Sequence, residues 1–270
     1  METLNIAFIG GGNMASAIIG GLVEAGVPSE NISVSDPLES NLQRLNESWS
    51  VKTSSSNLDV IAGSDIVILA VKPQVLLAVC EEIRQQLAEG CLVLSIAAGL
   101  SSAKIDQALG GSRAVIRCMP NTPALVKQGA SVLVANSLVS EAQKQAAESI
   151  LAAVGTVSWI EDEAQMDAVT AVSGSGPAYF FLVIESMIDA GVSLGLDAEL
   201  AQKLALQTAL GAAQLACDSE DPVAELRRKV TSPNGTTERA IQTFESKELR
   251  EIFRQAMEAC ALRSQELGAD

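Results

Sequence analysis

Histidine is absent from this 270-residue chain. Imidazole is the usual proton-transfer group near neutral pH and a common zinc ligand. Its absence excludes His-based catalytic triads, His-ligated zinc and proton transfer by imidazole. Any chemistry must therefore come from a cofactor or from hydroxyl, lysine and carboxyl groups. We predict no metal site.

Aromatic residues and positive charge are also scarce. Aromatics make up 3% of a chain that is 48% hydrophobic, so the core must be aliphatic. Lysine and arginine number 18 against 33 acidic residues, which leaves a net charge of −15. Such a surface repels nucleic acid and anionic membranes, so we predict neither as a partner. A phosphate-bearing ligand would have to be held by local hydrogen-bond donors.

Two further features bear on the compartment. The five cysteines are odd in number and form no CxxC motif, which favours small buried thiols in a reducing compartment. The stretch Thr3–Val23 carries no charge and is long enough for a membrane span. It is rich in glycine, however, and lacks the basic start of a signal peptide. We interpret it as a strand, a turn and a helix of a cytoplasmic protein.

The first part of the chain alternates short apolar runs with amphipathic stretches. The predicted strands are Leu4–Ile9, Ile32–Ser35, Ile66–Ala70, Leu92–Ile96, Ala114–Arg117 and Ser131–Ala135. The predicted helices between them are Asn13–Ala25, Glu39–Glu47, Gln74–Leu87 and Ser101–Leu109. This alternation predicts a doubly wound parallel sheet with helices on both faces.

After about Met166 no strand is predicted. The expected helices are Pro177–Leu194, Ala198–Cys217, Pro222–Val230 and Leu249–Leu267. Because Ala198–Cys217 is apolar on nearly all sides, we expect it to be buried, against another subunit. The predicted fold class is α/β: residues 1–163 form a doubly wound dinucleotide-binding domain, and residues 164–270 form an all-α dimerisation domain.

A glycine-rich turn follows the first predicted strand. Residues 10–15, GGGNMA, have the form G-x-G-x-x-A and open the next helix. Gly10 would make the tight turn, Gly12 would let a pyrophosphate approach the backbone, and Ala15 would keep the helix close to the sheet. Asp36 ends the second strand, where an acidic residue binds a ribose 2′-hydroxyl, whereas Ser35 would tolerate a 2′-phosphate. The pattern predicts a Rossmann-type nicotinamide dinucleotide site and leaves the choice between NADPH and NADH open.

Other polar segments follow predicted strands or open predicted helices. Lys72 ends a strand beside the expected anionic cofactor, and residues 95–99, SIAAG, leave room for a flat ring. Three loops carry clustered hydroxyls or amides: residues 117–124, RCMPNTPA; 172–179, VSGSGPAY; and 230–238, VTSPNGTTE. Each has a structural alternative: Lys72 as a solvated lysine, residues 117–124 as a rigid turn, and residues 172–179 and 230–238 as helix caps. Together they suit a small anionic substrate.

These segments, in this order, resemble the Δ1-pyrroline-5-carboxylate reductase family of proline biosynthesis. The matching stretches are FIGGGNMASAI (8–18), AVKPQ (70–74), SIAAG (95–99), RCMPNTPALV (117–126), AVSGSGPAYFF (171–181) and VTSPNGTTERAI (230–241). The resemblance implies an NAD(P)H-dependent oxidoreductase that reduces pyrroline-5-carboxylate to L-proline. It also implies a helical domain interlocked with a second subunit as a homodimer, with a higher ring of dimers left open. NADPH is the expected cofactor, with NADH as the alternative.

The resemblance also assigns residues. Those implied around the dinucleotide are Gly10, Gly11, Gly12, Asn13, Met14, Ala15, Ser35, Asn57, Val71, Lys72, Pro73 and Ala98. Those implied around the substrate are Asn121, Ser175, Ser232, Gly235, Thr236 and Thr237. Thr237 is the predicted catalytic residue, near the ring nitrogen. The chain departs from the family at Asn234, where glycine is common; asparagine tolerates a left-handed backbone, so we expect the loop to persist.

Without histidine, Thr237 or a water that it holds is our candidate for proton relay, unless the substrate binds already protonated. Two other functions are alternatives. A 3-hydroxyacid dehydrogenase-like reductase would need a lysine beside its substrate, and Lys203, Lys229 and Lys247 stand in no pocket motif. A non-catalytic dinucleotide sensor would not need the three polar loops.

Overall fold

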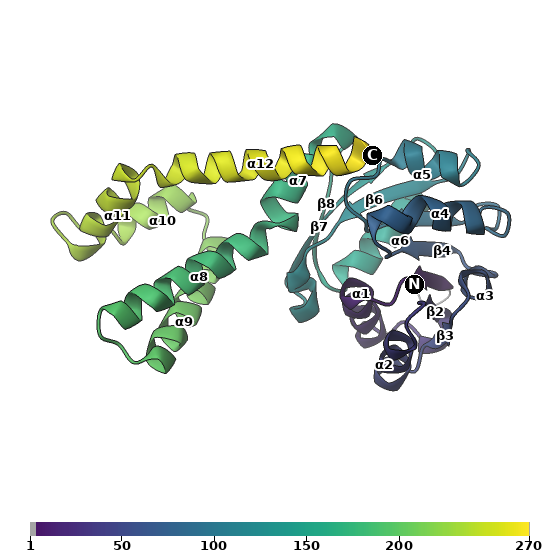
Figure 1. Cartoon of the computed structure of the whole chain (residues 1–270), viewed down its shortest axis with the longest axis horizontal. Helices are drawn as coiled ribbons and strands as arrows, with labels where there is room; N and C mark the ends of the chain where they lie inside the picture. The colour runs from purple at the N-terminus through teal and green to yellow at the C-terminus, as the bar shows by residue number, and fades with distance from the viewer. Residues whose placement is uncertain (1–3, 270) are drawn as a thin grey trace. The chain divides into compact units, whose positions relative to one another are not determined.

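The computed structural model describes residues 4–269, so Thr3 of the uncharged stretch lies outside the described residues. The chain forms two compact units (Figure 1). The first comprises the described residues up to Ser175 together with those from Cys260 onward, and the second is Gly176–Ala259. The predicted division at residues 163/164 coincides with neither limit and stays a prediction about the sequence domains.

The first unit is built on one sheet of eight strands within the described residues, in the order β3-β2-β1-β4-β5-β6-β7-β8. The strands are β1 Ile6–Ile9, β2 Ile32–Ser35, β3 Lys52–Ser54, β4 Ile66–Leu69, β5 Leu92–Ser95, β6 Val115–Met119, β7 Gly129–Ala135 and β8 Gly155–Trp159. The chain adds β2 and β3 on one side of β1 and then β4 on the other. This reversal places the topological switch point, where such sheets bind ligands, between β1 and β4.

The sheet is not wholly parallel, which corrects our prediction. β6 and β7 pair antiparallel, with Cys118 opposite Leu133. The physical reason is the length of their connection: residues 120–128, with a 3-10 helix at Thr122–Val126, are too few for a parallel crossover. The sequence reading also missed β3 and β8, which are partly exposed edge strands with little apolar pattern.

Helices cover both faces of the sheet (Figure 1). Those of the first unit's α/β part are α1 Asn13–Glu24, α2 Glu39–Trp49, α3 Asn57–Ile61, α4 Pro73–Ile83, α5 Ser102–Ala108 and α6 Glu141–Ala152, with a 3-10 helix at Ser29–Asn31. Alternate residues of β1 enter different cores, since Phe8 packs in one buried cluster with α1, α2 and α6 and Ile9 packs in another with α3, α4 and α5. The predicted two-faced α/β sheet is confirmed.

The remaining helices follow β8. They are a 3-10 helix at Glu163–Gln165, α7 Met166–Val169, a π-helix at Thr170–Gly174, α8 Gly176–Ser193, α9 Ala198–Asp218, α10 Val223–Lys229, α11 Thr236–Ser246 and α12 Leu249–Ala269. Within this single chain α9 is not buried, because Leu204, Leu210 and Leu215 are about half exposed or more. Its expected burial against another subunit stays a prediction. α8 likewise exposes Phe180 and Phe181. The second unit therefore carries apolar surface that its own residues leave uncovered.

One stretch of the described chain, Glu163–Ser193, is long and apolar enough to cross a membrane by length and composition alone. A single such stretch is weak evidence for a span. The uncharged N-terminal stretch, by contrast, forms β1 and α1 in its described part, as predicted. Among the cysteines, Cys80, Cys91 and Cys118 are buried, but Cys217 is exposed, so the prediction of buried thiols is wrong for that residue.

Candidate active site

The glycine turn lies at the switch point of the sheet. Gly10 has a φ of +101°, in the region that favours glycine. A Cβ on Gly10 would lie 2.6 Å from the carbonyl oxygen of Ala70, at the end of β4. The Gly10 N–H also donates to the Ser35 carbonyl, at 2.7 Å, at the end of β2. Only glycine allows the ends of these three strands to approach so closely.

The next glycine of the motif serves a different purpose. A Cβ on Gly12 would have no neighbour within 4 Å, so packing within the described residues does not require glycine there. Gly12 is the N-cap of α1, and no side chain of the described chain caps this helix. The first N–H groups of α1 are thus left to bind an anion. Open space at Gly12 beside an uncapped helix start fits a dinucleotide pyrophosphate.

Both polar side chains at the end of β2 are buried. Ser35 is fully buried, and its hydroxyl donates to Asn57 Oδ1 at 2.8 Å. Asp36 is 7% exposed, and its two carboxylate oxygens accept the N–H groups of Gly11 at 2.7 Å and Leu38 at 2.8 Å. Asp36 therefore holds the glycine turn in place, and the Ser35 hydroxyl orients the Asn57 side chain.

One residue at this edge was missed by the sequence reading. Arg44, an exposed residue of α2, donates from Nη2 to the carbonyl oxygen of Gly11 at 2.9 Å. No motif marks Arg44, because it lies eight positions beyond Asp36 on a helix face. Only the packing of α2 beside the glycine turn brings its guanidinium there.

The ends of β4 and β5 complete this edge of the sheet. Lys72 is exposed and is the N-cap of α4, with Pro73 as the first helical residue. Ala98 is half-buried in the loop after β5. The neighbouring Gly99 has a φ of +86°, and a Cβ there would lie 3.3 Å from the Gly268 nitrogen of α12. The end of α12 thus packs on the loop that carries Ala98.

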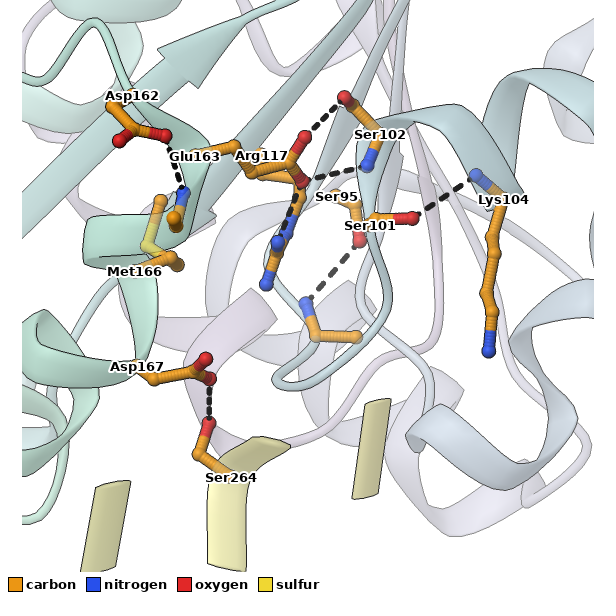
Figure 2. Close-up of polar contacts among 12 residues, drawn as sticks. Ser95, Ser101, Ser102, Lys104, Arg117, Asp162, Glu163, Met166, Asp167 and Ser264 are labelled. Atoms are coloured by element: carbon orange, nitrogen blue, oxygen red, sulfur yellow. Dashed lines mark hydrogen bonds and ion pairs between the residues drawn. The ribbon is translucent and has the colours of Figure 1, made fainter. Parts of the chain in front are cut away.

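An ion pair between a buried arginine and a partly exposed glutamate lies where that loop leads into α5 (Figure 2). Arg117 of β6, 5% exposed, donates to Glu163 Oε1 at 2.6 Å. Glu163 also accepts the N–H of Ser102 at 2.7 Å and the Ser102 hydroxyl at 2.6 Å, at the first turn of α5. Burial raises the pKa of Glu163, but the hydrogen bonds from Ser102 and Arg117 outweigh burial and hold this pKa below its ordinary value. The cluster ties β6, α5 and the segment after β8 together.

Two of the predicted substrate residues also lie in the first unit. Asn121 is 9% exposed, and its side chain bonds the Ala130 N–H at 2.8 Å and the Ser173 carbonyl at 3.1 Å. Ser175 accepts a hydrogen bond from the Cys260 thiol at 3.2 Å. Asn121 thus braces the π-helix that ends beside Ser175, and its amide is already engaged.

The other predicted substrate residues lie together in the second unit. Gly235 is the N-cap of α11, Thr236 and Thr237 form its first turn, and no side chain within the described residues caps it. Asn234 adopts a φ of +60°, as expected for an asparagine that replaces glycine. Its N–H donates to Glu238 Oε2 at 2.9 Å. The exposed hydroxyls of Ser232 and Thr237 and the free helix start offer donors suited to a carboxylate.

A glycine turn at the switch point of a doubly wound sheet, followed by helices with uncovered apolar faces, defines an oligomeric dinucleotide-binding protein of the Rossmann class. Comparison with family models supports both parts. Residues 5–99 match the family described as NADP oxidoreductase, coenzyme F420-dependent. Residues 163–267 match pyrroline-5-carboxylate reductase dimerisation. That second match includes the long apolar stretch beginning at Glu163, so its exposed surface is that of an oligomerisation domain.

Relatives cover almost the whole chain. A pyrroline-5-carboxylate reductase of Pseudomonas aeruginosa is 52% identical over 99% of this chain and 98% of its own. The solved structure of one from Coxiella burnetii has a TM-score of 0.93 at 45% identity and covers 98% of both chains. One from Plasmodium falciparum, with NADP bound, has a TM-score of 0.90 at 33% identity and covers 99% of both. The chain belongs to the pyrroline-5-carboxylate reductase family, as the sequence predicted.

Proposed function

We propose that this protein reduces 1-pyrroline-5-carboxylate to L-proline with NAD(P)H, the last step of proline biosynthesis. The observation that carries the dinucleotide part of the proposal is the glycine turn at the β1/β4 switch point, with open space at Gly12 beside an uncapped helix start. Relatives that share 40–52% of their residues with this chain over almost its whole length bear the name of that activity.

The proposed dinucleotide site lies along the carboxyl edge of the first strands. Its members are Gly10, Gly11, Gly12, Asn13, Met14, Ala15, Ser35, Asn57, Val71, Lys72, Pro73 and Ala98. NAD(P)H would supply the hydride. The N–H groups at the start of α1 would hold the pyrophosphate, and the exposed ammonium of Lys72 would offset its charge. Ser35 would contribute by orienting Asn57, since its own hydroxyl is buried.

The residues proposed to bind substrate are Asn121 and Ser175 in the first unit and Ser232, Gly235, Thr236 and Thr237 in the second. The start of α11 would bind the substrate carboxylate through its N–H groups and hydroxyls. Correct positioning of the imine carbon can lower the barrier by about 7–11 kcal/mol. Thr237 would hold a proton, directly or through a water, at the ring nitrogen. Support for this role is chemical: the chain has no histidine, and Thr237 is exposed in the first turn.

The proposal extends to assembly and location. The matched dimerisation domain and the exposed leucines of α9 support a homodimer, and a ring of such dimers is an extension of the same proposal. The sequence domains would divide at residues 163/164, where the dimerisation match begins. Free cysteines, three of them buried, support a location in the cytoplasm.

The decisive experiment mixes the purified protein with pyrroline-5-carboxylate and either NADPH or NADH and follows absorbance of the reduced nicotinamide. Loss of absorbance with formation of proline is expected. If the protein binds dinucleotide but consumes neither cofactor with this imine, the substrate assignment is wrong. A faster reaction with a 3-hydroxyacid or its ketoacid would instead favour a carbonyl reductase.

The role of Thr237 has a matched test in the same helix. We expect Thr237→Val to lower kcat at neutral pH by about 10²-fold or more, the usual contribution of a general acid. Thr243→Val is the control, because Thr243 lies further along α11, beyond its first turn, and its hydroxyl bonds only the Arg239 carbonyl among the described residues. Full kcat in Thr237→Val would remove the relay role and leave the substrate assignment intact.

A further inference from the structure

The choice between NADPH and NADH is made where the adenosine ribose lies, at the end of β2. In sheets of this kind an acidic residue there accepts from the 2′-hydroxyl of NADH, or a nearby arginine binds the 2′-phosphate of NADPH. The chain presents both groups, Asp36 and Arg44, beside the glycine turn. Their surroundings differ, and the difference favours one of them.

Asp36 is engaged within the protein. It is 7% exposed, and each carboxylate oxygen already accepts a backbone N–H. These two bonds stabilise its charge and direct the carboxylate toward the glycine turn and the start of the β2–α2 loop. Its contribution to a bound dinucleotide is therefore to keep Gly11 in place, which serves NADH and NADPH alike.

Arg44 has donors to spare. Its guanidinium carries five N–H groups, and the one hydrogen bond found within the described residues joins Nη2 to the Gly11 carbonyl at 2.9 Å. That bond keeps the cation at the glycine turn, while the exposed side chain leaves the remaining donors open to solvent. Arg44 forms no ion pair with any acidic residue in the part of the chain described, in contrast to Arg228, Arg250 and Arg254.

Ser35 and Asn57 are less suited than Arg44 to hold the 2′-phosphate. Ser35 is fully buried and donates to Asn57 Oδ1, and the Asn57 amide donates to Glu82 Oε2 at 2.9 Å. This line of three groups ends in a carboxylate, which repels a phosphate dianion. The charge of the chain, −15, disfavours a dianion as well, so a local cation has to hold it.

Building on the proposed function, we propose that Arg44 is the residue that recognises the 2′-phosphate and makes the protein selective for NADPH. The planar guanidinium binds two phosphate oxygens through its free N–H pair, a geometry that lysine does not reproduce. NADH, which carries a 2′-hydroxyl instead, gains nothing from it. The Gly11 carbonyl positions the guanidinium before the ligand arrives.

Titration calorimetry of the full-length protein tests this without turnover. The ligands are NADP⁺ and NAD⁺, and 2′,5′-ADP and 5′-AMP as fragments that differ in the same phosphate. We expect Arg44→Met to weaken NADP⁺ and 2′,5′-ADP at least about tenfold, the value of one charged hydrogen bond, and to leave NAD⁺ and 5′-AMP within about twofold. Arg44→Lys should recover part of the loss. The salt dependence of NADP⁺ binding should fall in Arg44→Met.

Lys52→Met is the matched control. Lys52 is an exposed cation at the first residue of β3, at the opposite end of the strand from the edge where β2 stops. The substitution removes one positive charge from the same domain. It should change neither the ratio of NADP⁺ to NAD⁺ affinity nor that of 2′,5′-ADP to 5′-AMP. Equal weakening of both dinucleotides in Arg44→Met would mean that Arg44 only supports the glycine turn, and no weakening of either would mean that the phosphate lies elsewhere; both results overturn the proposal. Reduction of pyrroline-5-carboxylate with NADH in Arg44→Met would show that the proposed function stands independently.

Discussion

Replacing Glu163 with glutamine changes the charge of the Arg117–Glu163 cluster while keeping its shape. Glutamine can still accept from Arg117 and from the Ser102 N–H through its amide oxygen, and its amide nitrogen can donate to the Ser102 hydroxyl. What disappears is the negative charge facing a guanidinium that is 5% exposed and whose Nε atom, among the described residues, has no hydrogen-bond partner. The substitution therefore isolates the electrostatic part of the cluster.

The magnitude follows from three hydrogen bonds and the burial of Arg117. Bonds to a charged acceptor contribute about 1.5–3 kcal/mol, against about 0.5–1.5 for neutral ones. The Glu163 side chain is 28% exposed, so solvent already screens part of its charge. The loss of free energy is therefore smaller than for a fully buried pair. We expect Glu163→Gln to lower the free energy of unfolding by about 2 kcal/mol. Glu163→Ala should cost about 4 kcal/mol, because it leaves the Arg117 charge buried and unpaired.

The effect should depend on pH with a definite sign. The pKa of Glu163 is below its ordinary value of 4.5 in the folded protein. A depressed carboxyl pKa contributes stability that is present above the unfolded pKa and is lost as pH falls through the folded value. The difference between wild type and Glu163→Gln should thus stay constant from neutral pH to about 5 and shrink below about 4.5.

Urea unfolding at fixed protein concentration, at several pH values, measures both quantities. Glu161→Gln is the control, since Glu161 is exposed and two residues away; its effect should stay within about 0.5 kcal/mol. A loss in Glu163→Gln no larger than in the control, or one that is the same at low and neutral pH, would refute the reasoning.

Four other substitutions or reactions follow from the structure. Gly12→Ala should unfold like the wild type but bind NAD(P)⁺ more weakly in calorimetry, because its Cβ meets only the space proposed for the pyrophosphate. Gly10→Ala should unfold at a lower temperature than the wild type, because its Cβ would clash with the Ala70 carbonyl. Cys217 should react with a thiol reagent in the native protein, while burial raises the pKa of Cys80 to about 12 and should keep it inert until unfolding. Leu210→Glu, on the exposed face of α9, should shift the protein to smaller assemblies in analytical ultracentrifugation, and an unchanged mass would exclude that face from the interface.

Much of the α/β part could be predicted because local patterns dictate it. Near-continuous apolar runs became β1, β4 and β5, buried on both faces, and the glycine turn became the start of α1 at the predicted residue. The antiparallel turn into β7 was not predictable from composition, since strand direction depends on how far the connection can reach. β3 was missed because three polar residues pair as a strand only when β2 is already beside them.

The sequence by itself determined the dinucleotide-binding turn, the two-part organisation and the family, because glycine conformations, hydrophobic period and motif order are local properties of the chain. Only the tertiary structure decided which groups at the end of β2 face outward. Ser35 and Asp36 both turned inward, and Arg44, eight positions further along, was brought to the glycine turn by the packing of α2. The Arg117–Glu163 pair was likewise created by folding, since its members are 46 residues apart and meet only once β6 and the segment after β8 are in place. Side-chain direction and long-range pairing depend on neighbours that no stretch of sequence contains.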